Sequence, residues 1–146
     1  MSEHSERGFR FLEHTTDAEI EAFGRGLNDS FENAGLAAED LMVDLASIRP
    51  ITQKNIEVTG EDIESLLYNW LEELISLQDI EGLLFSKFSC SISKSKDRLK
   101  LKATASGEKF DPTKHEQKTA IKAPTYHDMK ILQRENGVSM RFLLDL

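Results

Sequence analysis

The feature of this sequence that most constrains its fold is an apolar stripe with helical spacing in the middle of the chain. The spacing runs three, one, three, one, three, one through Ile63, Leu66, Leu67, Trp70, Leu71, Leu74 and Ile75. Such a pattern places every member on one face of an α-helix. Thr59 or Asp62 is the expected N-cap, and Gly82 marks the expected end. Because the stripe is wide and carries the only tryptophan, it predicts the main core helix.

A second amphipathic helix is predicted over residues 27–45. Its apolar residues recur on one helical face: Phe31, Ala34, Ala38, Leu41, Met42 and Leu45. Glu32, Glu39 and Asp40 lie off that stripe. Pro50 ends this region because proline cannot continue a hydrogen-bonded helix.

Alternation of apolar and polar residues predicts the strands. It is clearest where Ala18, Ile20 and Ala22 alternate with glutamates, which is typical of a strand with one solvated face. The expected strands cover residues 9–14, 18–24, 51–59, 88–92, 99–105, 126–134 and 138–144, with a polar loop over 107–119. The order β-β-α-β-α-β-β-β-β predicts an α+β (two-layer α/β) fold. We expect a mostly antiparallel sheet of about six to seven strands covered by two helices.

The dipeptide Asn136-Gly137 between the last two strands is a strong hairpin signal. If these two residues form the turn, Glu135 lies opposite Val138. The same register places Asp128 directly opposite Asp145, and Met129 and Ile131 on the core face.

Composition and charge limit the function classes. The 146 residues, 39% hydrophobic and 30% charged, fit one folded domain; residues 1–8 are expected to form a flexible tail and residues 9–146 that domain. Lys and Arg number 18 against 26 Asp and Glu, a net charge of −8. So negative a surface argues against general nucleic-acid binding. The chain shows no signal peptide and no apolar run near the ~20 residues that span a bilayer, so a cytoplasmic location is expected.

Familiar catalytic motifs are absent from the sequence. It contains no glycine-rich phosphate loop, G-x-S-x-G, H-E-x-x-H or C-x-x-C, so an enzyme built on one of these is not expected. The single cysteine, Cys90, falls on the apolar face of its strand, which predicts a small buried residue rather than a nucleophile.

Two groups of polar residues remain as candidate sites. Glu13-His14-Thr15-Thr16-Asp17 gathers two acids, an imidazole and two hydroxyls in the break between the first two strands. Such breaks present functional groups, although the same side chains also close turns by hydrogen bonding. At the other end, Asp145, the carboxylate of Leu146 and Asp128 would repel one another at one strand end. A hard cation such as Ca²⁺ or Mg²⁺ would relieve this, whereas screening would suffice if all three faced water.

Taken together, several motifs resemble the archease family. The resemblance covers nearly the whole chain in the right order and is carried by Glu13–Asp17, Phe31–Ala34, Leu66–Leu74, Gly107–Asp111, His115, Lys122–His127 and Leu144–Leu146. Thr16 stands where the family usually has alanine.

This resemblance implies an α/β fold with a strand-helix-strand-strand module and a protein that is not itself an enzyme. It implies an activator of the GTP-dependent tRNA-splicing RNA ligase that promotes guanylylation of the ligase's active-site histidine, multiple turnover and broadened NTP use. It also implies a metal site formed by Asp17, Asp145 and Leu146, with Ca²⁺ as the expected ion and Mg²⁺ or Mn²⁺ as alternatives.

Four further residues are candidates for facing the ligase or its nucleotide. Lys122 and His127 match positions of the family pattern, and His14 lies in the matched opening motif. Asp128 is added by the hairpin register alone.

Three other functions remain open. The basic residues of one predicted hairpin could make the chain an RNA-binding module or chaperone: Lys94, Lys96, Arg98, Lys100 and Lys102. Few aromatic residues stand among them to stack bases, so stable direct nucleic-acid binding is not expected. The carboxylates could instead serve a stand-alone metal-dependent phosphoesterase, or the chain could be a purely structural adaptor.

Overall fold

The computed structural model describes residues 8–14 and 16–146, and most of the predicted tail, residues 1–7, lies outside them. The elements follow one another in the predicted order. They are β1 (Gly8–His14), β2 (Asp17–Gly24), α1 (Leu27–Met42), the 3₁₀ turn η1 (Leu45–Ser47), β3 (Thr52–Gly60), α2 (Ile63–Glu81), β4 (Leu83–Ser95), β5 (Arg98–Lys109), β6 (Ala123–Arg134) and β7 (Gly137–Asp145).

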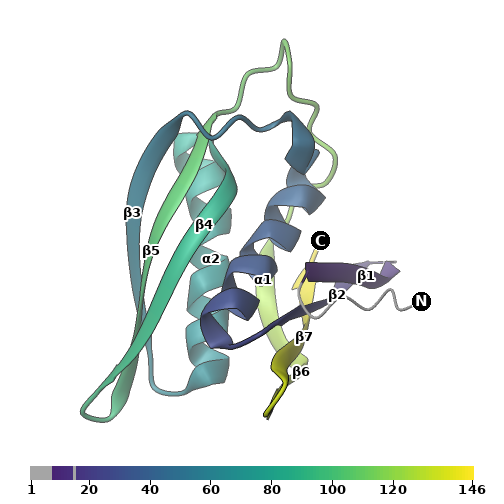
Figure 1. Cartoon of the computed structure of the whole chain (residues 1–146). Helices are drawn as coiled ribbons and strands as arrows, with labels where there is room; N and C mark the ends of the chain where they lie inside the picture. Colours follow the sequence, from purple (N-terminus) through teal and green to yellow (C-terminus); the bar gives the residue numbers. More distant parts are fainter. Residues whose placement is uncertain (1–7, 15) are drawn as a thin grey trace.

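The two helices lie between two antiparallel sheets (Figure 1). One sheet has four strands in the order β1-β2-β7-β6, and the other has three in the order β3-β5-β4. Each helix contacts strands of both sheets. The predicted α+β class, the two helices and the seven antiparallel strands are therefore confirmed. We expected one sheet covered by helices and find two, because alternation locates strands but does not determine how distant strands pair.

Local signals explain both ends of α2. Asp62 is its N-cap and accepts a hydrogen bond from the Ser65 N–H at 2.8 Å. Of the two N-caps that the sequence allows, Thr59 and Asp62, the structure therefore uses Asp62. Gly82 ends the helix with φ 68°, a left-handed conformation that glycine adopts without steric cost. The predicted stripe is buried except for Ile63, which is partly buried, and the Trp70 indole N–H donates to the Phe31 carbonyl of α1 at 2.9 Å. No helix in the described residues is long and apolar enough to cross a membrane.

Helix α1 can be covered on two sides because several of its buried residues are small. Its buried positions include Ala34, Ala37 and Ala38. A Cβ added at Gly35 would lie 2.9 Å from the Phe88 ring and 3.1 Å from Leu74. Close approach of α1 to both β4 and α2 therefore requires this glycine.

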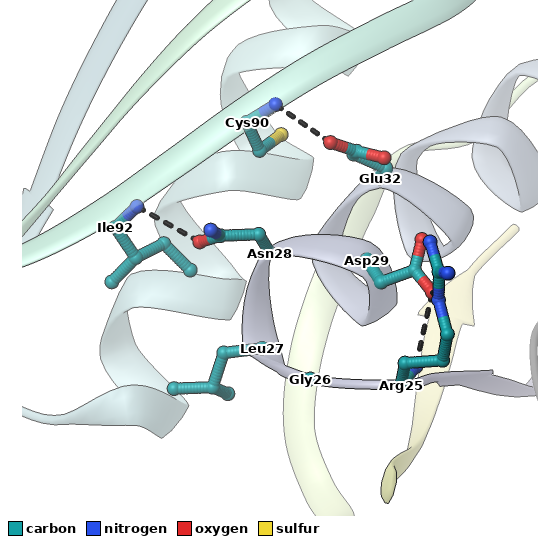
Figure 2. A pocket seen from close by; sticks show the side chains of 8 residues that line it. All are labelled: Arg25, Gly26, Leu27, Asn28, Asp29, Glu32, Cys90 and Ile92. Carbon is teal, nitrogen blue, oxygen red and sulfur yellow. Dashed lines mark hydrogen bonds and ion pairs between the residues drawn. The ribbon is translucent and has the colours of Figure 1, made fainter.

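Polar side chains of α1 that lie off the apolar stripe contact the edge strand β4. Side-chain oxygens of Asn28 and Glu32 accept hydrogen bonds from the main-chain N–H groups of Ile92 and Cys90 in β4, at 2.9 and 2.8 Å (Figure 2). Glu39 likewise accepts a hydrogen bond from the Phe85 N–H of β4 at 3.0 Å. These bonds satisfy part of the unpaired edge of the sheet.

The β6–β7 hairpin has a different register from the one predicted. Arg134 pairs with Gly137, so Glu135 and Asn136 form the turn, and Gln133 rather than Glu135 lies opposite Val138. The prediction was therefore wrong by two residues. A shift of two leaves every side chain on the same face, so Met129 and Ile131 still pack against the core. Apolar patterning cannot distinguish these two registers.

A bulge further along β6 also contradicts the predicted pairing of Asp128 with Asp145. Asp145 lies opposite Ala123, and the register shifts between Thr125 and Lys130. Asp128 lies within this bulge with φ 56°, a left-handed conformation that is uncommon outside glycine.

Candidate functional site

The carboxylates at the start of β2 and the end of β7 lie side by side. Asp17 and Asp145 are direct partners in the antiparallel ladder between these strands. Both alternate with buried neighbours, Ala18 and Leu144, so both side chains project from the face of the four-stranded sheet that is turned away from the helices. Folding thus brings together two acids that are far apart in sequence.

The start of β2 and the end of β7, with Asp17 and Asp145, form what we call the corner. Main-chain hydrogen bonds there determine how closely the two acids are spaced. The Leu146 N–H donates to the Thr16 carbonyl at 3.3 Å, and the Lys122 N–H donates to the Asp145 carbonyl at 2.8 Å. Because hydrogen-bonded and non-hydrogen-bonded pairs alternate in an antiparallel ladder, Asp17 and Asp145 occupy a non-hydrogen-bonded position. Cα atoms in such a pair are about 4.5 Å apart and their side chains are at their closest.

The neighbouring acids on this face have cationic partners. Glu21 contacts Arg10 at 2.7 Å, and Glu19 contacts Arg141 at 3.8 Å. In the described part of the chain, by contrast, neither Asp17 nor Asp145 has an ion-pair partner. Like charges directly opposite one another destabilise a sheet, so a cation held between these two acids would be stabilising.

The oxygen atoms available at this corner fit a hard cation. Two carboxylates and nearby main-chain oxygens are ligands that Ca²⁺, Mg²⁺ or Mn²⁺ prefer, whereas zinc prefers nitrogen and sulfur. No group of three or more His, Cys, Asp or Glu side chains among the described residues is arranged to hold a metal. Any ion here would therefore need main-chain oxygens, water or atoms of a partner to complete its coordination.

The other predicted site residues lie just before β6, in the bulge of β6 and at the end of β1. Lys122 is exposed and directly precedes β6, where its N–H binds Asp145. His127 and Asp128 are exposed in the bulge, with His127 Nε2 and Asp128 Oδ2 3.4 Å apart. The backbone of His14 pairs with Ala18, while its side chain and the whole of Thr15 lie outside the described residues.

A buried ionic cluster was missed by the sequence analysis. Glu108 accepts hydrogen bonds from the Arg49 N–H at 2.8 Å, from Lys114 Nζ at 2.7 Å and from His115 Nε2 at 2.9 Å. His115 Nδ1 accepts the Asp111 N–H at 2.9 Å, so Nδ1 carries no proton and Nε2 is the donor. This cluster fixes the loop after β5 against the segment before β3.

The sequence predicts a polar loop over residues 107–119, which contain Glu108 and His115. Residues 107–109 instead complete β5, where a Cβ on Gly107 would collide with the Leu84 carbonyl oxygen. The signal in the sequence that could have indicated this extension of β5 is Gly107 followed by Glu108 at the end of the alternating strand pattern.

A hollow of about 560 Å³ lies at the start of α1 (Figure 2). Cys90 lines it together with Asn28 and Glu32, whose side chains bind β4. Burial, and secondarily the negative charge of Glu32, raises the pKa of the Cys90 thiol. Cys90 is thus a buried thiol in its protonated form, as predicted.

The fold and the corner define a class: a small α+β domain that presents two directly opposed carboxylates at the ends of the two central strands of its four-stranded sheet. Residues 9–146 match the family model described as the archease protein family (MTH1598/TM1083). Protein archease of Sulfurisphaera tokodaii is 44% identical over 94% of this chain and 98% of its own, and that of Pyrococcus abyssi is 48% identical over 86% and 88%.

A solved structure gives the same result. The solution structure of protein 1598 of Methanobacterium thermoautotrophicum matches with a TM-score of 0.83 and 41% identity, over 95% of this chain and 99% of that one. The chain belongs to the archease family, as the sequence resemblance predicted.

Proposed function

We propose that this chain activates a GTP-dependent tRNA-splicing RNA ligase and is not itself the catalyst. In this proposal it promotes guanylylation of the ligase's active-site histidine, supports multiple turnover and broadens the choice of NTP. Membership of the archease family supports the general role. The observation that carries the proposed mechanism is the directly opposed, unpartnered pair Asp17 and Asp145.

The chain's own residues would act by placing oxygen atoms at the ligase. Asp17 and Asp145 would hold a divalent cation, with main-chain oxygen of Leu146 as a further ligand. The bound ion would supply positive charge for the triphosphate of the nucleotide during guanylylation. Lys122, next to Asp145 and exposed, would face the same nucleotide or the ligase surface.

The proposal is tested by measuring ligase guanylylation with isosteric variants. Asp17→Asn and Asp145→Asn each remove one charge and keep the side-chain shape. Glu19→Gln is the matched control because Glu19 lies on the same strand and face, one outward position from Asp17, opposite Leu143. We expect each Asp variant to lower the stimulation by at least about tenfold, as loss of a metal ligand does, and the control to retain it.

Unchanged stimulation by both Asp variants would overturn the metal-site mechanism and favour a structural adaptor. Turnover of a phosphoester by the isolated chain, lost in the same variants, would contradict the activator proposal and favour a phosphoesterase. Circular dichroism of each variant verifies that the fold is intact.

A further inference from the structure

The exposed face of the three-stranded sheet differs in charge from the rest of the molecule. The chain as a whole has a net charge of −8. The outward positions of β4 and β5 nevertheless carry four cations, Lys87, Arg98, Lys100 and Lys102, and the facing positions of β3 carry one acid, Glu57. Exposed charges more than about 8 Å apart are largely screened at physiological salt. A ligand at this face would therefore meet mainly these cations.

Glu57 forms an ion pair with one of them and lies directly opposite another, Lys102, in the ladder between β3 and β5. It contacts Lys100 Nζ at 3.1 Å, while Arg98 binds the neutral Thr59 hydroxyl at 3.4 Å. Lys87 and Lys102 have no ion-pair partner among the described residues. Their charges remain available to an anionic partner.

Hydroxyl and amide groups surround these cations. A hollow of about 560 Å³ lies around Lys102, and its polar lining includes Asn55, Ser89, Ser91 and Thr104 together with the acid Glu57. The outward positions of the sheet carry no aromatic residue, so the face offers phosphate and hydroxyl contacts but no stacking on bases.

We propose that this face, the outward side of β3, β5 and β4, binds the sugar–phosphate backbone of double-helical RNA. Helical RNA is recognised chiefly through phosphates and 2′-hydroxyls, and lysines with serine, threonine and asparagine side chains are the groups that bind them. Single-stranded RNA binding normally uses aromatic stacking, which this face lacks. The negative charge elsewhere on the chain makes the contact weak and salt-sensitive. The inference is independent of the carboxylate pair and of the ligase.

The experiment measures binding of a fluorescent RNA hairpin stem to the isolated full chain by anisotropy, between 50 and 200 mM salt. The test variant is Lys87→Ser with Lys102→Ser. The control is Lys109→Ser with Lys130→Ser, which removes the same charge from other surfaces. We expect the test variant to bind at least about fivefold more weakly at low salt, with a salt dependence reduced by roughly two units of log–log slope. The control and a Lys87→Arg, Lys102→Arg variant should bind as the unaltered chain does.

Three results would overturn the inference. One is the absence of stem binding by the unaltered chain at low salt. Another is an equal loss in test and control variants, which would indicate a general charge effect. The third is equal or tighter binding of single-stranded RNA or of poly-glutamate, which would assign the face to a different polyanion.

Discussion

Glu39 and Glu108 are both buried glutamates, yet their charge states are opposite. Glu39 accepts one hydrogen bond, from the Phe85 N–H, and its Oε2 has no partner among the described residues. Burial therefore raises its pKa to about 8, against a small lowering by that bond. Burial also acts to raise the pKa of Glu108, but donors from Arg49, Lys114 and His115 outweigh it and lower the pKa to about 2.

The comparison shows that partners, and not burial alone, decide whether a carboxylate is charged. Glu39 binds a proton because nothing else compensates its charge. Glu108 stays ionised because it has a cation and two N–H donors. The pair Asp17 and Asp145 is a third case, in which two exposed or half-exposed acids face each other without any cation in the described chain.

The largest expected effect is on the pH dependence of stability through Glu39. Its folded-state pKa is raised, so the folded state binds more protons than the unfolded state between pH 4.5 and about 8. Stability should therefore fall as pH rises through this range, by up to about 5 kcal/mol, since one pKa unit is about 1.4 kcal/mol. Glu39→Gln should remove most of this fall in urea unfolding at pH 5 and pH 9. If the free energy of unfolding of Glu39→Gln falls between pH 5 and pH 9 as much as that of the unaltered chain, Glu39 is not the group responsible.

For Glu108→Gln we expect the opposite pH dependence from that of Glu39→Gln, because the pKa of Glu108 is lowered and not raised. This variant leaves Lys114 and the buried His115 without their carboxylate, and it should lower the free energy of unfolding at pH 7 by roughly 3 kcal/mol. Because the folded-state pKa of Glu108 is lowered, its contribution is complete above pH 4.5 and is lost as pH falls through about 2. The variant should therefore lose less stability in acid than the unaltered chain. Equal acid sensitivity of the two proteins would contradict this explanation.

A smaller effect separates the two kinds of donor to Glu108. Lys114 is 37% exposed, whereas His115 is fully enclosed. Lys114→Met removes the cation but leaves both N–H donors, and screening by solvent limits the loss to about 1 kcal/mol. Its acid unfolding midpoint should move to higher pH, because the pKa of Glu108 rises without Lys114. A loss as large as that of Glu108→Gln would mean that the cation alone carries the cluster.

The smallest expected effect on stability comes from the opposed acids Asp17 and Asp145. Asp17→Asn removes like-charge repulsion and should raise the free energy of unfolding in chelator by about 0.5 kcal/mol. Glu19→Gln breaks the contact with Arg141 and should leave stability the same or slightly lower. Destabilisation by Asp17→Asn in chelator would indicate that Asp17 has a stabilising partner in the metal-free chain.

Much of the fold could be predicted because local patterns determine it. The stripe from Ile63 to Ile75 specified α2, and the Asp62 and Gly82 signals specified its ends. The helix predicted to reach Leu45 ends earlier, at Met42, because Asp40 accepts the Leu45 N–H and Asp44 the Ala46 N–H in a separate 3₁₀ turn. The division into two sheets depends on long-range pairing, which no local pattern encodes.

The candidate site could be predicted only in part. Alternation placed Asp145 on the face opposite the core, and the family resemblance, not spacing, supplied Asp17 as its neighbour. The pairing of Asp128 with Asp145 failed because a bulge has no apolar signature. The burial of Glu39 depends on where β4 lies against α1, which its position off the apolar stripe did not reveal.

The most direct test of the central claim, a cation site between Asp17 and Asp145, is calcium binding measured by isothermal titration calorimetry. The full chain, freed of metal by chelation, should bind Ca²⁺, and the Glu19→Gln variant should bind it with the same affinity. Asp17→Asn and Asp145→Asn should each weaken binding by at least about tenfold. If both variants bind Ca²⁺ as the unaltered chain does, or if the unaltered chain binds none of Ca²⁺, Mg²⁺ and Mn²⁺, the claim is wrong.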